Sequence, residues 1–204
     1  MYIRLWKRLI DLCLSTLGIA ILAPLFAVLA IAIKADDPGP VFFSQKRVGI
    51  HKTYFPILKF RTMKMDTPHD MPTHLLTNPD AYITRVGHLL RKTSLDELPQ
   101  LFQIWTGKMA IIGPRPALWN QFDLIDERDK YGANDVRPGL TGWAQINGRD
   151  ELCVEEKARL DGEYVKHMGF AFDCKCFFGT IGKVLTHEGV VEGCADKNEA
   201  GKHD

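Results

Sequence analysis

A long apolar run near the N-terminus constrains this chain more than any other feature. From Leu9 to Ile33 the side chains are apolar apart from Asp11, Ser15 and Thr16. At about 1.5 Å per residue, a helix of this length could cross a hydrocarbon core of about 30 Å. A secretory signal peptide would also follow basic residues, but the run is long for one and no small-residue cleavage site follows it cleanly. The run therefore predicts a membrane-embedded helix.

The course of that helix depends on Pro24 and on the basic residues at both ends of the run. Proline deletes one backbone hydrogen bond and bends a helix. The basic flanks are Arg4, Lys7 and Arg8 before the run and Lys34, Lys46 and Arg47 after it. Because such flanks favour the cytoplasmic face, a helix that enters, bends at Pro24 and leaves on the same side satisfies both ends. A straight span that tolerates the proline is an equal alternative on the residues alone.

The charge balance and the cysteine pattern of the chain argue against nucleic-acid binding, a disulfide framework and a zinc site. The 204 residues carry 26 basic and 25 acidic side chains, a net charge of +1, whereas a general nucleic-acid binder would show a basic excess. We therefore expect no nucleic-acid partner. The five cysteines have neither disulfide-framework nor zinc-site spacing, so we interpret them as structural residues of a reducing compartment.

Short sequence patterns predict an α+β domain that is mainly helical. Aromatic and β-branched runs at Val41–Phe43 and Tyr54–Phe60, around Gly49, predict a small hairpin. Asp66–Asp80 is polar and proline-containing, which predicts a loop, and Asn78-Pro79 is typical of a helix start. Further helices are expected at Ala117–Tyr131, stopped by Gly132, at Val154–His167, and at Asp173–Thr186, whose apolar stripe could rest on a bilayer surface.

Arginines recur next to proline, glycine or a helix end, where the backbone fixes their direction. A guanidinium fork suits bidentate binding of phosphate oxygens, although any one surface arginine more often pairs loosely with a carboxylate. Together they suggest a phosphate pocket formed by Arg61, Arg91, Arg115, Arg137 and Arg149. The chain has no P-loop, dinucleotide-binding or serine-hydrolase motif, so neither a P-loop kinase nor a serine hydrolase is indicated.

The stretch Thr93–Gln100 contains adjacent carboxylates, Asp96 and Glu97. Ser94 and Glu97 have the spacing of a capping box, and residue type alone favours that structural interpretation. The functional alternative uses the same geometry: paired carboxylates beside arginines could hold a divalent cation and supply a nucleophilic oxygen to phosphorus.

The ordered motifs of this chain resemble the monotopic phosphoglycosyl transferases, also called bacterial sugar transferases, from about Tyr2 to Leu185. The motifs are Lys7-Arg8-x-x-Asp11, Pro24, Asp37-Pro38-Gly39-Pro40-Val41-Phe42-Phe43, Gln45-x-Arg47-x-Gly49, Lys59-Phe60-Arg61-Thr62-Met63, Leu89 to Gln100, Gly113-Pro114-Arg115-Pro116 and Arg137 to Arg149. So many motifs in order make a chance match very improbable.

The resemblance implies a chemistry and a topology. Asp96 would be the nucleophile that attacks the β-phosphate of a UDP-sugar, of the N-acetylated hexosamine type, and expels UMP. Glu97, with Asp96, would hold Mg²⁺ and assist proton transfer, and the substrate-binding set would extend to Lys59 and Gln145. Polyprenyl (undecaprenyl) phosphate would then take the phosphosugar, in the first membrane step of glycoconjugate assembly ahead of downstream glycosyltransferases.

The family's first helix is re-entrant and broken at a Ser-Pro pair, where this chain has Ala23-Pro24. We therefore expect a re-entrant membrane helix over residues 1–36, a catalytic domain on the cytoplasmic face of the bacterial inner membrane over 37–186, with a short hairpin and interfacial amphipathic helices, and a loose tail over 187–204. The chain resembles the minimal catalytic form, without an additional membrane bundle. A membrane-anchored nucleotide-sugar pyrophosphohydrolase and a non-catalytic membrane scaffold are the alternatives.

Overall fold

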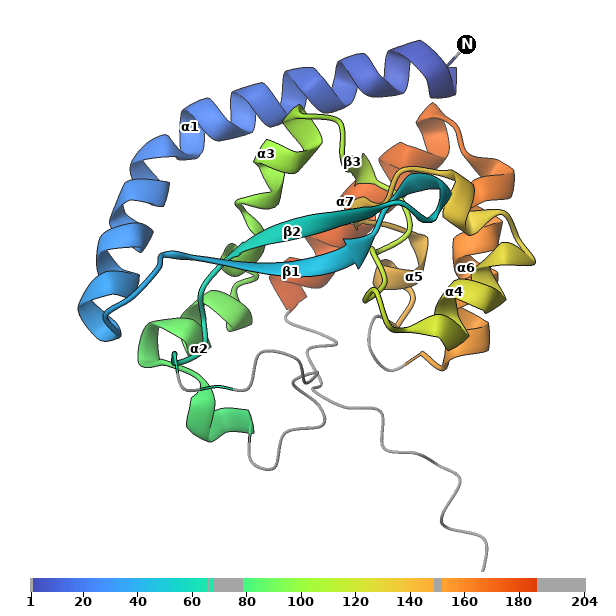
Figure 1. Cartoon of the computed structure of the whole chain (residues 1–204). Coiled ribbons are helices and arrows are strands. Elements are labelled where there is room, and N and C mark those ends of the chain that lie inside the picture. The colour runs from blue at the N-terminus through green and yellow to red at the C-terminus, as the bar shows by residue number, and fades with distance from the viewer. Residues whose placement is uncertain (1, 66, 68–78, 149–151, 187–204) are drawn as a thin grey trace, which may run out of the picture.

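The computed structural model describes residues 2–65, 67, 79–148 and 152–186, which form one long helix and several shorter ones around two small sheets (Figure 1). In chain order the elements are a π-helical turn η1 (Tyr2–Trp6), α1 (Lys7–Asp36), β1 (Phe42–Val48), η2 (Ile50–Lys52), β2 (Tyr54–Phe60), η4 (Pro79–Tyr82), α2 (Arg85–Lys92), η5 (Leu95–Glu97), α3 (Gln100–Trp105), β3 (Ala110–Ile112), α4 (Phe122–Asp129), η6 (Ala133–Asp135), β4 (Gly139–Thr141), α5 (Trp143–Ile146), α6 (Val154–His167) and α7 (Phe170–Thr186). The mixed, mainly helical fold class is confirmed.

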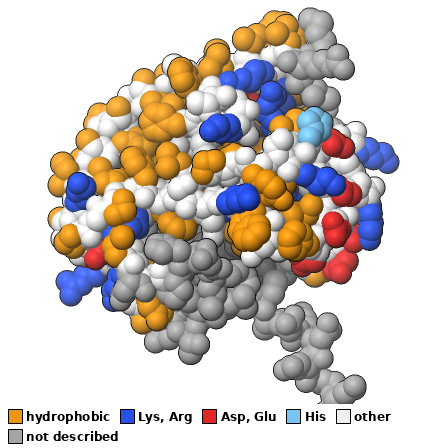
Figure 2. Space-filling view, viewed as in Figure 1, with side chains coloured by type: hydrophobic (Ala, Val, Ile, Leu, Met, Phe, Trp, Pro, Cys, Tyr) orange, Lys and Arg blue, Asp and Glu red, His pale blue; other side chains and the backbone are white. Residues whose placement is uncertain are grey.

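Helix α1 is continuous through Pro24 and bends in its second half, so that it curves along one side of the molecule (Figure 1). Its outer face is apolar: Ile21 and Ile31 are 66% and 71% exposed, and hydrophobic side chains gather along the helix (Figure 2). Within the described residues α1 is the one helix whose length and composition would allow it to cross a membrane. The re-entrant course stays a prediction.

The inner face of α1 is fastened to the domain by the Lys-Arg-x-x-Asp motif. Arg8 donates to the last two carbonyls of α3, at 2.5 and 2.7 Å. Asp11 accepts the backbone N–H of Ile111 at 3.0 Å, and Lys7 forms an ion pair of 2.7 Å with Asp173 at the start of α7. These polar contacts, which are partly buried except for the exposed Arg8–Trp105 bond, connect the apolar helix to three separate elements, α3, β3 and α7, and so fix its orientation on the domain.

Strands β1 and β2 form the predicted antiparallel hairpin, with Phe42 opposite Phe60 and Val48 opposite Tyr54. The first strand extends five residues beyond the predicted Phe43, because the alternation of exposed and covered side chains continues to Val48. Phe60 packs under α1 against Leu29 and Ile33, which places the end of β2 beneath the membrane-type helix.

Strands β3 and β4 are parallel, with Ala110 opposite Gly139 and Ile112 opposite Thr141. Their carboxyl ends therefore meet at one edge, from which the chain continues into Gly113–Pro116 after β3 and into α5 after β4. In α/β sheets this edge is where ligands bind.

Three predicted helices begin or end elsewhere in the structure. Pro79 begins only a short 3-10 turn, and α2 begins after Thr84, whose hydroxyl accepts the N–H of Gly87 at 2.9 Å and so provides the true N-cap. The helix predicted over Ala117–Tyr131 is confined to Phe122–Asp129, because Leu118 instead bridges to Arg47 of β1. The helix at Val154–His167 is confirmed, and the last helix begins at Phe170, three residues before its predicted start. The predicted loop over 66–80 lies mostly, and the tail entirely, outside the described residues.

Candidate functional site

The two adjacent carboxylates lie on the short turn η5, between α2 and α3. Ser94, immediately before the turn, has a left-handed backbone (φ 56°) and makes no capping hydrogen bond within the described residues. The capping-box interpretation is therefore wrong. The positive φ is unusual for a non-glycine residue and reverses the chain sharply, which carries Asp96 and Glu97 toward strand β2.

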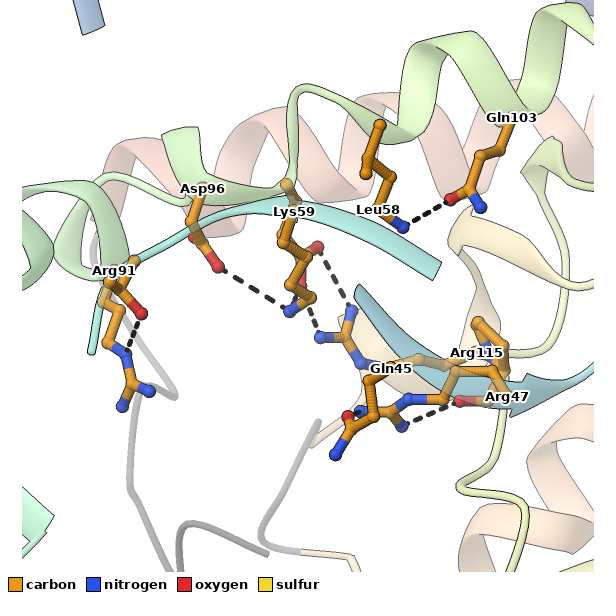
Figure 3. A network of polar contacts seen from close by, with 11 residues as sticks. Gln45, Arg47, Leu58, Lys59, Arg91, Asp96, Gln103 and Arg115 are labelled. Carbon is orange, nitrogen blue, oxygen red and sulfur yellow. Dashed lines mark hydrogen bonds and ion pairs between the residues drawn. The ribbon is translucent and has the colours of Figure 1, made fainter. Parts of the chain in front are cut away.

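A network of charged side chains surrounds these carboxylates (Figure 3). Lys59 of β2 places its Nζ 2.8 Å from Glu97 Oε1 and 3.6 Å from Asp96 Oδ2. Arg115, from the loop after β3, donates to both oxygens of Glu97, at 2.5 and 3.3 Å. Three elements far apart in sequence thus meet at two carboxylates, and two cations hold Glu97 in one orientation.

The two carboxylates have opposite pKa shifts. Burial raises the pKa of Asp96, and the negative charge of Glu97 adds to that, while Lys59 opposes it. Burial also disfavours the charged form of Glu97, but the charges of Arg115 and Lys59 outweigh it and hold the pKa of Glu97 well below its usual range. Glu97 is therefore a fixed anion. Asp96 is a desolvated carboxyl that accepts no hydrogen bond from a cation among the residues that the structure describes, which makes it the better nucleophile of the two.

The other predicted arginines lie at different distances from this network. Arg91 donates its Nε–H to Thr62 Oγ1 at 3.0 Å, and its charge still lowers the pKa of Asp96, so it belongs to the surroundings of the site. Arg61 is buried and paired with Asp37 at 2.7 Å, where it joins the end of α1 to β2. Arg137 is exposed and donates to the carbonyl of Gly107. Arg149 lies outside the described residues.

Gln145 lies on α5, after the carboxyl end of β4. Its side chain is buried, and neither its carboxamide nitrogen nor its oxygen has a hydrogen-bond partner within the described part of the chain. The structure therefore brings Lys59, Asp96, Glu97 and Arg115 together, with Gln145 on the neighbouring edge formed by the parallel strands.

Sequence reasoning missed Gln45 and Arg47 as members of the site. Paired strands place Phe43, opposite Lys59, on one face of the hairpin, and alternation puts Gln45 and Arg47 on that same face. Arg47 donates to the carbonyl of Pro116 at 3.1 Å and to Gln45 Oε1 at 2.8 Å, beside Arg115 (Figure 3). The period-two alternation along β1 was the signal that could have identified them.

The carboxylate pair is also the part of the site that could hold a metal. Among the described residues no group of three or more His, Cys, Asp or Glu side chains is arranged to bind one. Mg²⁺ characteristically binds through one or two carboxylates, with substrate phosphates and water completing its shell. Asp96 and Glu97 fit that pattern, provided that Glu97 yields one of its present hydrogen bonds.

Comparison with known proteins is consistent with this arrangement. The profile described as "Bacterial sugar transferase" matches residues 2–187. The chain is 40% identical over 188 residues to the undecaprenyl-phosphate glucose phosphotransferase of Komagataeibacter xylinus, covering 86% of this chain and 35% of that protein. It is 38% identical over 184 residues to the uncharacterized sugar transferase EpsL of Bacillus subtilis, covering 90% and 89%.

A third similar protein is the UDP-glucose:undecaprenyl-phosphate glucose-1-phosphate transferase of Escherichia coli, which is 40% identical over 188 residues. The match covers 88% of this chain and 40% of that protein. The chain thus spans well under half the length of two of these relatives and most of the length of the third.

Proposed function

Because this chain belongs to the bacterial sugar transferase family, we propose that it transfers a sugar 1-phosphate from a UDP-sugar to polyprenyl phosphate. Undecaprenyl phosphate is the lipid named for the relatives from K. xylinus and E. coli. The products would be a polyprenyl-diphospho-sugar and UMP. The observation that carries the proposal is the desolvated Asp96 beside the Lys59–Glu97–Arg115 network.

The reaction proceeds in two balanced steps at Asp96. A carboxylate oxygen of Asp96 attacks the β-phosphorus of the UDP-sugar, and the bond from that phosphorus to the bridging oxygen breaks, so that UMP leaves with the electron pair. An oxygen of polyprenyl phosphate then attacks the same phosphorus and expels Asp96 as a free carboxylate. The acyl phosphate formed between the steps is an activated species, which makes the second step easy.

The neighbouring charges serve positioning and charge neutralisation, which dominate phosphoryl transfer. Lys59 lies beside both carboxylates and Arg115 lies beside Glu97, so both would bind phosphate oxygens of a substrate at Asp96, while Glu97 holds both cations in place. Mg²⁺, when bound by Asp96 and Glu97, would supply further neutralisation of phosphate charge. We also propose Arg91 as a phosphate ligand, since its charge reaches Asp96.

The donor sugar is the finer part of the proposal. The motif resemblance leads us to expect an N-acetylated hexosamine, whereas glucose is the sugar named for the relatives from K. xylinus and E. coli. A donor screen with UDP-glucose, UDP-galactose and UDP-N-acetylhexosamines decides between them.

We further propose that α1 is re-entrant and that the domain faces the cytoplasm, where UDP-sugars are made. The bend in the half of α1 that contains Pro24 and the basic residues at both ends support this course. Single cysteines placed near Tyr2 and near Ser44 would then both be labelled from the cytoplasmic side. Labelling of the N-terminal position from the opposite side would contradict the re-entrant course and leave the chemistry at Asp96 intact.

A turnover assay tests the function itself. The full chain in membranes or detergent is incubated with a UDP-sugar, with and without a polyprenyl phosphate, and UMP and the lipid product are measured. We expect UMP in proportion to a sugar diphospholipid. Free sugar phosphate in place of the lipid product would indicate a pyrophosphohydrolase, and no UMP with any donor would indicate a scaffold.

A further inference from the structure

The carboxyl ends of β3 and β4 bring two proposed substrate-binding residues to one edge. Arg115 follows the end of β3 by three residues, and Gln145 follows the end of β4 by four. The N–H of Gly113 donates to the carbonyl of Thr141 at 2.8 Å, and the N–H of Gly139 donates to the carbonyl of Pro114 at 2.9 Å, so the segment that leads to Arg115 lies against β4. The strand that leads to Gln145 and the segment that leads to Arg115 are therefore in direct backbone contact.

Burial of the Gln145 carboxamide costs free energy, because no hydrogen bond within the described residues compensates for its lost hydration. Its side chain is 8% exposed, and both Nε2 and Oε1 lack a hydrogen-bond partner there. A buried polar group without a partner costs about 1–3 kcal/mol, and native structures rarely retain one without a role. A ligand that pairs with both atoms would recover this cost on binding.

The neighbours on α5 show which way Gln145 faces. Trp143 packs on Phe172 of α7, and Ile146 contacts Gly179 of the same helix. Ala144 packs with Leu160 of α6 and with Leu152, which precedes that helix. Gln145 occupies the remaining side, toward the turn between β4 and α5. A Cβ built on Gly142 would lie 2.2 Å from the carbonyl oxygen of Gly113 and 3.0 Å from Gln145 Oε1. Glycine at position 142 therefore allows the chain after β4 to lie against Gly113, and Gln145 Oε1 lies beside the same glycine.

We propose that the Gln145 carboxamide is the subsite for the uracil ring of the nucleotide, an inference that rests on the proposed function. A carboxamide offers one donor and one acceptor side by side. The uracil imide presents the complementary pair, an N3–H donor next to a carbonyl acceptor, so a bidentate pairing satisfies both orphaned atoms. The phosphate groups need cations instead, which Lys59 and Arg115 provide.

A matched pair of glutamine variants tests the subsite. Gln145→Met preserves volume and flexibility but removes both polar atoms. In the control, Gln103→Met removes an equally buried carboxamide that is paired at both ends, with its Nε2 donating to the carbonyl of Pro56 and its Oε1 accepting the N–H of Leu58. The full chain in detergent is used for thermal unfolding and for calorimetric titration with UMP and with inorganic pyrophosphate.

The proposal predicts a split between stability and binding. Gln145→Met should unfold at the same temperature as the unmodified protein or higher, whereas Gln103→Met should unfold at a lower one. Gln145→Met should weaken UMP binding about tenfold and leave pyrophosphate binding unchanged. A thermal loss like that of Gln103→Met, unchanged UMP affinity, or equal weakening of UMP and pyrophosphate would each overturn the proposal.

Failure of the subsite and failure of the proposed function give different results. If the unmodified protein transfers phosphosugar while Gln145→Met binds UMP normally, the uracil subsite is wrong and the function stands. If Gln145→Met shows the expected split but the unmodified protein yields no sugar diphospholipid from any UDP-sugar, the function is wrong and the nucleotide subsite stands. A raised KM for the UDP-sugar with unchanged UMP affinity would assign Gln145 to the sugar and overturn the proposal.

Discussion

Replacing Arg115 by lysine keeps a positive charge near Glu97 but removes the planar fork. In the structure Nη1 and Nη2 of Arg115 donate to different oxygens of Glu97, at 3.3 and 2.5 Å, so the guanidinium plane is fixed at both edges. A lysine ammonium is a compact point charge on a flexible stem and cannot reproduce this paired geometry.

The structure separates the expected effects on stability and on catalysis. The Arg115 side chain is 38% exposed, so its ion pair is partly screened and the loss in free energy of unfolding should be below about 1 kcal/mol. Removing one preorganised donor from a developing charge typically costs about 10²–10³-fold in rate. We therefore expect Arg115→Lys to lose about 10²-fold in kcat with a small change in melting temperature.

The assay is UMP release at saturating donor and polyprenyl phosphate, together with thermal unfolding of the same preparations. Arg159→Lys is the matched control, because Arg159 pairs with Glu156 at 3.9 Å on the surface of α6 and its side chain is 57% exposed. It should retain near-native turnover. Turnover by Arg115→Lys within about twofold of the unmodified protein would refute the claim that the fork binds phosphate oxygens.

Three further substitutions follow from the contacts. Glu97→Gln removes a like charge that raises the pKa of Asp96, whose ionised form is the nucleophile. The acid limb of the pH profile of kcat/KM should therefore move to lower pH, and an unmoved limb would contradict the electrostatic coupling of Glu97 to Asp96. Asp173→Ala removes the ion-pair partner of Lys7, whose side chain is 12% exposed, and the acceptor of the buried Tyr164 hydroxyl, so the free energy of unfolding should fall by about 3 kcal/mol in chemical denaturation. A loss under about 1 kcal/mol would refute the fastening of α1. Arg61→Met removes the ion pair with Asp37, so the free energy of unfolding should fall by about 2 kcal/mol while the folded protein keeps most of its turnover. A loss of turnover without a loss of stability would indicate that Arg61 binds phosphate.

Local sequence patterns correctly predicted the elements whose ends do not depend on contacts with remote segments. The strand at Tyr54–Phe60 and the helix at Val154–His167 are typical in residue type and spacing, and both are confirmed. The predicted start of α2 was wrong because both Pro79 and Thr84 are suitable residues for a helix start. The hydrogen bond from the N–H of Thr84 to the carbonyl of Thr62, which the sequence does not reveal, favours Thr84. The shorter α4 has a similar origin, since Leu118 is held by β1 rather than by helical hydrogen bonds.

The sequence predicted those site residues whose type and motif indicate a chemical role. Asp96, Glu97 and Arg115 stand in short motifs that the sequence displays, and the structure brings them together. The Arg61–Asp37 ion pair and the Arg47–Pro116 hydrogen bond join segments that are remote in the chain, which spacing does not encode. The left-handed Ser94 was also hidden, because its conformation is imposed by the surrounding structure against the preference of its residue type.

The central claim is that Asp96 carries the phosphosugar, and a single turnover without lipid tests it most directly. The full chain is mixed with excess UDP-sugar and no polyprenyl phosphate, quenched, and measured by intact mass and by the mass of the peptide that contains Asp96. We predict one equivalent of UMP at most, a phosphosugar adduct on Asp96 that polyprenyl phosphate discharges, and neither product with Asp96→Asn. UMP formed only when lipid is present, with no adduct on the protein, would contradict the covalent account.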